Sequence, residues 1–501
     1  MNPYLVKELR QLTRSKVVSG GLVLLLFGQL VAAAIAVPAV ARMSEAVSGS
    51  SASATGGIAD TPPLGMILGG VFGVILGLAL CIVLPFLVFA RFVSENPKGR
   101  TTVELATAAP PSAAIDGKVQ AGLVLAAALA AGSMPFQLLC VALRGVDFVS
   151  VLLSCGGTLL ACSVQLHFAA LFAASPAASA GRRWATMVVF QFFFGQYLLF
   201  GGVAMAVAAA SGAPGASIFL RSSATVGGSA VALLAATSLN LLLRASATRS
   251  LAPPSTDRDR VPRLTLLALW AVWGVVAAVA AGIRSEANFL WVWGGVFLAA
   301  LLVSFLGASG APPGIPRRIL AERSASRRAR LLRFPFSAAY AGGLFFSLGL
   351  LAATFLLAFL LASAVDRDPF GAEGATILLR HLALAFYVLA VPMVLRGALF
   401  RLAPRHLPLV PTLSVALLLL LQLPPLLLAI GHGKPPDGFP FFLPGIFGIE
   451  ERTVVLHLVF SGVALLAGFG LTDPELASSL RADLAPPTAG DGAQGRAPSR
   501  P

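Results

Sequence analysis

Charged residues are scarce in this chain: Asp, Glu, Lys and Arg together make up only 11% of its 501 residues. Water-soluble domains carry about 25% charged residues. The mean hydropathy is high, at +0.87, and some apolar runs, such as 64–90 and 264–283, contain no charge at all. Runs of about 18 or more such residues can cross a bilayer as helices. The composition therefore excludes a string of soluble domains and predicts an all-α, polytopic integral membrane protein.

Residues that could hold a metal or a nucleotide are also few. The five histidines are scattered, and no two have metal-ligand spacing on one helix face. All four cysteines lie inside apolar runs, where we expect them to pack as small apolar side chains. The phosphate-binding motif G-x-x-x-x-G-K-[ST] does not occur, since Gly117-Lys118 is followed by Val119. We therefore expect no catalytic residue, metal or cofactor in this chain, and no enzyme activity of its own.

Twelve apolar runs are long enough to be membrane crossings. They span residues 17–41, 64–90, 119–143, 148–174, 184–210, 225–243, 264–283, 288–306, 334–365, 377–395, 408–430 and 453–471. If the N-terminus is cytoplasmic, 28 of the 36 Lys and Arg residues fall on that side, seven fall on the other, and Arg380 lies inside a crossing. This bias follows the positive-inside rule and predicts that both termini are cytoplasmic. Topology, rather than recognition of nucleic acid or of particular lipids, thus accounts for the net charge of +15. We expect membrane lipids around the crossings and no nucleic-acid partner.

Changes in composition divide the chain into four parts. We predict a cytoplasmic amphipathic helix at 1–16, a six-helix membrane domain at 17–250, a second six-helix bundle at 251–471 and a disordered cytoplasmic tail at 472–501. The tail is rich in Pro, Ala and Gly and has too little apolar surface to order itself.

Glycines recur at every fourth position of the second crossing, at Gly65, Gly69, Gly73 and Gly77. This spacing places them on one helix face, where the backbone of another helix can approach closely. The partner is either another helix of this chain or a second subunit, so a homo- or hetero-oligomer is one of the two possibilities.

The N-terminal segment has the pattern of a helix lying in the membrane interface. Tyr4, Leu5, Leu9 and Leu12 share one face, whereas Lys7, Glu8 and Arg10 spread over the other. The loop between the second and third crossings has its own pattern: Thr102, Glu104 and Leu105 suggest a short helix, Pro110-Pro111 ends it, and Asp116-Gly117-Lys118 leads back to the membrane.

These two segments resemble permeases of ATP-binding cassette exporters of the type-2 export class. Such permeases often open with an N-P-x-x-x-K-E-L-R-like helix, and their first cytoplasmic loop often reads like T-x-E-L-L-x-x-x-P-x-S-x-x-x-I-x-x-G-K. The matching residues here are Asn2, Pro3, Lys7, Glu8, Leu9 and Arg10, then Thr102, Glu104, Leu105, Pro110, Ser112, Ile115, Gly117 and Lys118. Ala106 replaces the second Leu of the loop motif, and the spacing is one residue short before Ile115 and again before Gly117. Neither motif has a clear second copy after residue 250.

The resemblance covers about residues 1–250 and implies a permease domain that docks on a separate P-loop ATPase, which binds the ATP. It implies that Lys7, Glu8, Arg10, Glu104 and Lys118 couple the two subunits, and that the protein resides in a bacterial cytoplasmic (inner) membrane. We therefore expect the permease subunit of an ATP-driven exporter. Two alternatives remain: a twelve-helix secondary carrier, and a membrane enzyme acting on lipid-linked substrates. The absence of carboxylates well inside the predicted crossings argues against an ion-coupled carrier.

The charge bias makes the topology testable. We expect a membrane-impermeant thiol reagent applied from outside to label Ser48→Cys, in the loop predicted at 42–63, and to leave Ser324→Cys unlabelled until the membrane is opened. The native cysteines serve as the background because all four lie inside predicted crossings. Labelling of position 324 in intact cells would contradict the predicted orientation.

Overall fold

The computed structural model describes the chain in separate stretches. These are residues 3–13, 16–49, 64–95, 111–143, 148–175, 181, 183–192, 223–252, 259–284, 290, 293–294, 297, 305, 335, 340–365, 389–403, 410, 413–414, 417, 463, 466–467 and 471. Within them the secondary structure is helical throughout, apart from a few turn and irregular residues at helix ends. The all-α fold class predicted from the apolar runs is therefore confirmed for the described residues.

The chain divides into two compact units, Met1–Ala252 and Pro253–Pro501. Unit 1 contains α1 (Pro3–Thr13), α2 (Lys16–Gly49), α3 (Leu64–Leu78), η1 (Ala79–Val83), α4 (Leu84–Glu95), α5 (Pro111–Ala142), α6 (Phe148–Ala174) and α9 (Ser223–Leu251). Unit 2 contains α10 (Arg260–Arg284) and α14 (Tyr340–Val365). Further helical turns lie at 183–192 and 389–402.

Six of the described helices are long and apolar enough to cross a membrane, which indicates an integral membrane protein. These segments are Leu68–Glu95, Pro111–Ala142, Val151–Ala174, Ala230–Leu251, Arg260–Ile283 and Gly342–Leu361. A further apolar stretch, Gly20–Ile35, lies within α2. Each of these overlaps a predicted crossing. The crossings predicted at 288–306, 408–430 and 453–471 fall almost wholly outside the described residues, so the number twelve stays a prediction.

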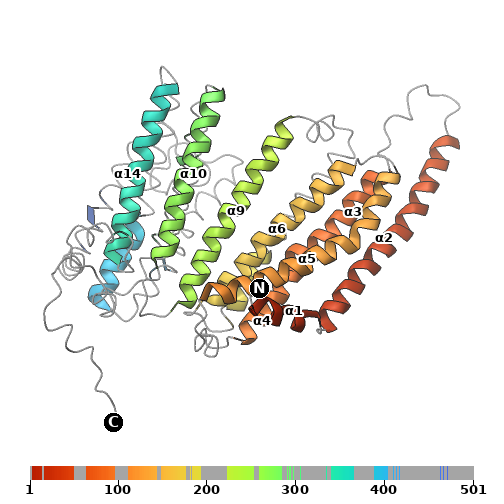
Figure 1. Cartoon of the computed structure of the whole chain (residues 1–501), viewed down its shortest axis with the longest axis horizontal. Helices are drawn as coiled ribbons and strands as arrows, with labels where there is room; N and C mark the ends of the chain where they lie inside the picture. The colour runs from red at the N-terminus through yellow and green to blue at the C-terminus, as the bar shows by residue number, and fades with distance from the viewer. Residues whose placement is uncertain are drawn as a thin grey trace, which may run out of the picture. The chain divides into compact units, whose positions relative to one another are not determined.

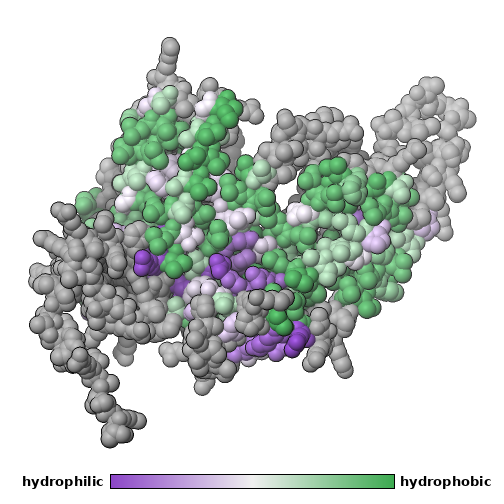
Figure 2. Space-filling view, in the orientation of Figure 1, coloured by the Kyte–Doolittle hydropathy of each residue, from purple (hydrophilic) through white to green (hydrophobic). Residues whose placement is uncertain are grey.

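Within unit 1 the long helices run side by side (Figure 1). Helix α2 packs on α3, α3 on α5, α5 on α6, and α6 on α9, while the short α1 packs against α5. Apolar side chains cover much of the visible surface of these helices, and hydrophilic ones gather at the end where α1 lies (Figure 2). This distribution fits a helix bundle with hydrocarbon around its middle and water at its α1 end.

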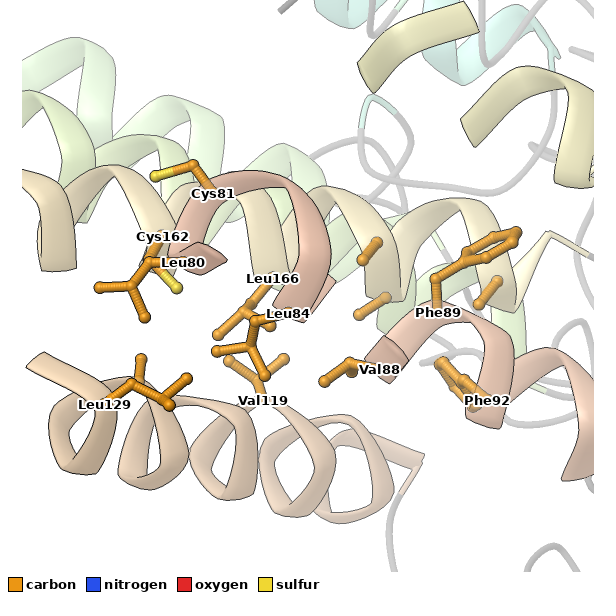
Figure 3. Packing of buried hydrophobic residues seen from close by; sticks show 14 of the residues in the cluster. Leu80, Cys81, Leu84, Val88, Phe89, Phe92, Val119, Leu129, Cys162 and Leu166 are labelled. Atoms are coloured by element: carbon orange, nitrogen blue, oxygen red, sulfur yellow. The ribbon is translucent and has the colours of Figure 1, made fainter. Parts of the chain in front are cut away.

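The core of unit 1 lies where η1 and α4 pack between α5 and α6 (Figure 3). Small residues let these helices approach closely, which matters where lipid removes the hydrophobic drive for association. At Gly122 of α5, an added Cβ would lie only 3.0 Å from a methyl carbon of Leu166 on α6. All four cysteines are free and buried in this unit, so their predicted role in packing agrees with their surroundings.

A π-helical turn, η1, interrupts the helix that runs from Leu64 to Glu95. The N–H of Leu84 bonds to the carbonyl of Ala79, five residues back. Pro85 follows at once; it has no N–H to give, and its ring would clash with the carbonyl four residues before it. The wider turn makes room for Pro85 without ending the helix, as π-bulges do. This turn was not predicted from the sequence.

Two helix ends differ from the predicted boundaries. Helix α2 continues to Gly49, past the expected end of its crossing at 41, and carries Pro38 inside it. Helix α5 begins at Pro111, eight residues before the crossing expected at 119. Proline suits the first turn of a helix, where its missing N–H has no partner to lose. Apolar runs report where hydrocarbon ends, whereas backbone hydrogen bonding continues beyond that point.

Unit 2 is held by hydrogen bonds from tryptophans as well as by apolar packing. The indole N–H of Trp270 on α10 donates to Oγ1 of Thr354 on α14 at 2.8 Å, and that of Trp293 donates to the Trp270 carbonyl at 3.3 Å. Gly274 gives Trp293 room, because an added Cβ would lie 3.1 Å from its ring. Buried Trp side chains need such a partner for the N–H, so these bonds fix how α10 and α14 meet.

Candidate functional site

Three successive residues of α5 connect it to its neighbours in unit 1: Asp116 contacts α9, Gly117 contacts α1, and Lys118 contacts both α1 and α4. Successive side chains on an α-helix point about 100° apart, so this triplet faces three directions around α5. We call it the DGK triplet. It lies in the first turns of α5, directly after the loop segment of the sequence motif.

Lys118 joins α5 to α1 and α4. Its ammonium Nζ lies 2.7 Å from Oε1 of Glu8 on α1 and also forms an ion pair with Glu95 at the end of α4. The side chains of Lys118 and Glu8 are only 3% and 2% exposed. The ammonium also lies over the ring of Phe92, 5.2 Å from its centre, where the negative face of the ring attracts a cation.

Arg91 completes the charge balance of this cluster. Its Nε lies 3.3 Å from Oε2 of Glu8 and 3.4 Å from Oε1 of Glu95, and its Nη2 donates to Gln11 on α1. Two cations thus face two carboxylates. Burying a charge costs several kcal/mol unless it is paired and hydrogen-bonded, so the neutral set of Glu8, Arg91, Glu95 and Lys118 explains how Lys118 can be buried.

Gly117 allows α1 to lie directly on α5. A Cβ at this position would come within 2.5 Å of the Tyr4 Cβ and 3.1 Å of the Leu5 backbone nitrogen. Any side chain larger than hydrogen would therefore push the backbone of α1 away. This is a position where close approach requires glycine, and it sets the α1–α5 distance that the Glu8–Lys118 bond needs.

Asp116 joins α5 to α9 through a two-pronged ion pair. Nε and Nη2 of Arg244 donate to the two oxygens of Asp116 at 2.6 and 2.5 Å. Fork-to-fork bonding of this kind is geometrically specific as well as strong. The side chains of Asp116 and Arg244 are 23% and 41% exposed, respectively, so water weakens this pair relative to the buried Lys118 cluster.

The structure brings together two of the five residues predicted to couple the chain to an ATPase. Glu8 and Lys118 bond directly, whereas Lys7 and Arg10 are exposed on α1. Glu104 lies outside the described residues. Arg91, Glu95 and Arg244 were not predicted as site residues from the sequence. The sequence does hold a sign of them, because each is a charged residue at the end of an apolar run on the side predicted to be cytoplasmic.

The glycine face of the second crossing has open space at its C-terminal half. An added Cβ at Gly73 or Gly77 would meet no atom within 4 Å. Gly65 is buried, and Gly69, Gly73 and Gly77 are half-buried. Close helix packing at Gly73 and Gly77 therefore does not come from the described residues of this chain. The second possibility, an interface with another subunit, stays a prediction for these two positions.

Removal of the Lys118 charge should destabilise unit 1. We expect Lys118→Met to lower the free energy of unfolding by about 3–5 kcal/mol, because Glu8 is then left buried without its main partner. Denaturant titration in detergent measures this. The comparison is Lys7→Met: Lys7 is exposed on α1 and attracts Glu95 through solvent-screened charge, so its loss should cost less than about 1 kcal/mol. In the double variant Glu8→Gln, Lys118→Met, the two losses should not add; full additivity would show that the bond contributes nothing.

Gly117 offers a second test, independent of charge. We expect Gly117→Ala to cost about 1–3 kcal/mol, typical of overpacking, and to raise the protease sensitivity of α1, because the new methyl group displaces Tyr4. Gly73→Ala is the control, since its methyl group would meet open space. Equal effects of the two substitutions would show that α1 does not rest on Gly117.

No protein-family model, curated protein or solved structure matches the chain. The meaning of the site therefore comes from its own contacts: two sequence segments, more than 100 residues apart, meet through a buried ion pair.

Proposed function

We propose that this chain is the membrane permease subunit of an ATP-driven exporter, powered by a separate P-loop ATPase. The observation that carries the proposal is the Glu8–Lys118 bond. Its two residues come from the two segments whose sequences resemble the coupling segments of type-2 export permeases. A partner that moves either segment acts on the other through this bond.

The DGK triplet supplies a route from such a partner to the bundle. Residues 96–110, which belong to the loop predicted between the second and third crossings, precede α5 in the chain, so a push on them would reach the first turns of α5 and the DGK triplet. From there, Lys118 transmits to α4 through Glu95, and Asp116 transmits to α9 through Arg244. Packed helices with discrete ion pairs tend to shift as rigid bodies between alternative arrangements, which is the motion that alternating access requires.

The proposed partner contributes the chemistry that this chain lacks. It binds ATP and hydrolyses it, and it contacts α1 and loop 96–110 on the side predicted to be cytoplasmic. The exposed Lys7 and Arg10 of α1 and the predicted loop residue Glu104 offer charges of both signs to it. A bacterial cytoplasmic membrane is the proposed location, with the substrate moving outward.

The test is copurification followed by coupled turnover. The tagged protein, extracted from its native membrane, should carry a P-loop ATPase identified by mass spectrometry, and the pair should hydrolyse ATP in lipid nanodiscs. We expect Glu104→Ala to weaken ATPase binding by about fivefold or more, the loss of roughly 1 kcal/mol from a desolvated charged contact. Glu475→Ala, in the predicted tail, is the matched control and should bind as the unaltered chain does.

Different outcomes separate the possible functions. Absence of any ATPase from the purified protein contradicts the proposal. Substrate flux that follows an ion gradient would then favour the secondary carrier, and turnover of a lipid-linked substrate by the isolated chain would favour the membrane enzyme. Equal ATPase binding by Glu104→Ala and Glu475→Ala would retain the permease but remove Glu104 from the contact.

A further inference from the structure

Helix α6 carries a buried carboxamide that meets a second one from the helical segment 183–192. Nε2 of Gln191 donates to Oε1 of Gln165 at 3.2 Å. The two residues are only 3% and 0% exposed, respectively. Gln165 lies within the apolar segment Val151–Ala174. Gln165 is therefore well inside a stretch that can cross the membrane.

The pair leaves one donor and one acceptor unused. Nε2 of Gln165 and Oε1 of Gln191 are buried and have no hydrogen-bond partner in the structure. Two carboxamides can satisfy each other through two bonds, since each has both donors and an acceptor. Here only one bond forms, so a free N–H group and a free carbonyl oxygen flank it. Leaving such groups unpaired in an apolar environment is costly.

Water can serve both free atoms, and so can the hydroxyl group of a molecule dissolved in the surrounding lipid. It accepts a hydrogen bond from the Gln165 N–H and donates one to the Gln191 oxygen with a single oxygen atom. Among the described residues no charged side chain bonds to either carboxamide, and desolvation of an unpaired charge is expensive, so an ionised group is disfavoured. Arg183, two turns from Gln191, donates to the Ala173 carbonyl at 2.9 Å. The chemistry thus favours an uncharged ligand with a hydroxyl group.

The segment 183–192 gives such a ligand a path from the lipid. Its inner stripe, Arg183, Met187 and Gln191, is buried, whereas Val188 and Phe192 on the other side are 51% and 60% exposed. In the described structure, the carboxamides are separated from the apolar outer surface by the width of this one helix. Because the two free atoms are buried, we expect a ligand already dissolved in the membrane to reach them when 183–192 moves apart from α6.

We propose that Gln165 and Gln191 form a binding site for the hydroxyl group of an uncharged, membrane-dissolved amphiphile. The amphiphile's hydroxyl bridges the free N–H of Gln165 and the free carbonyl of Gln191, and its apolar chain lies among the side chains of α6 and 183–192. The site is independent of the proposed ATPase, since it needs no nucleotide and no partner. Within a permease it would hold a substrate in transit.

Photolabelling tests the site with a defined probe. The purified full-length chain in lipid nanodiscs is exposed to a long-chain primary alcohol with a mid-chain diazirine, and to the methyl ether of the same compound. We expect the alcohol to label peptides of α6 and 183–192, and an excess of unlabelled alcohol, but not of the matched alkane, to compete. The double variant Gln165→Leu, Gln191→Leu should lose about tenfold in labelling, as the loss of two net hydrogen bonds implies.

A matched control removes a buried carboxamide elsewhere. Gln29 on α2 is also fully buried, with no partner for either its nitrogen or its oxygen, and Gln29→Leu should leave the labelling unchanged. Equal labelling by the alcohol and the ether, or equal labelling of the double variant and the unaltered chain, overturns the proposal. The competition between alcohol and alkane uses the unaltered chain alone, so it decides the matter even if the double variant fails to fold. ATPase copurification is unaffected by either result.

Discussion

A lysine ammonium buried at one end of a membrane bundle is the interaction on which the rest of unit 1 depends. Lys118 draws Glu8 and Glu95 toward α5, and Arg91 balances the charge that they bring. Without this charge balance, moving the ammonium out of water would be unfavourable. The position of α1, the end of α4 and the first turns of α5 therefore follow from one electrostatic requirement. Gly117 permits this arrangement because it lacks the Cβ atom that would keep α1 away from α5.

The scarcity of charge in the sequence gives each remaining charge a larger role. A soluble protein scatters ion pairs over its surface, where each contributes little. In the described part of unit 1, several of the ion pairs lie at helix ends on the side predicted to be cytoplasmic, and they join helices distant in sequence. The middle of the bundle relies instead on small residues and carboxamides. Forces from outside the membrane can therefore enter at the charged end, where helices are linked by specific bonds.

Much of the fold was predictable, because hydrocarbon imposes a length and a polarity on every crossing. The apolar runs located α3–α4, α5, α6, α9, α10 and α14, and the spacing of Tyr4, Leu5, Leu9 and Leu12 predicted a helix where α1 lies. The apolar runs did not predict irregular turns inside a crossing or the extension of a helix beyond it. An almost uniformly apolar segment has no periodicity that would reveal η1, and the extension of α2 to Gly49 lies past the lipid boundary. The resemblance pointed to Glu8 and Lys118, but only three-dimensional packing shows that they bond to each other.

The ion pairs of Lys118 and of Asp116 also differ in the order in which their partner residues are synthesised. Glu8, Arg91 and Glu95 all precede Lys118 in the chain, so they already exist when the ribosome completes α5. Arg244 follows Asp116 by 128 residues, so Asp116 must wait through the synthesis of the next helices. The buried Lys118–Glu8 pair is the one whose partners are synthesised first, and the partly exposed Asp116–Arg244 pair is completed later. Order of synthesis and depth of burial thus agree, and no charge of the triplet has to leave water before its counter-charge is there to meet it.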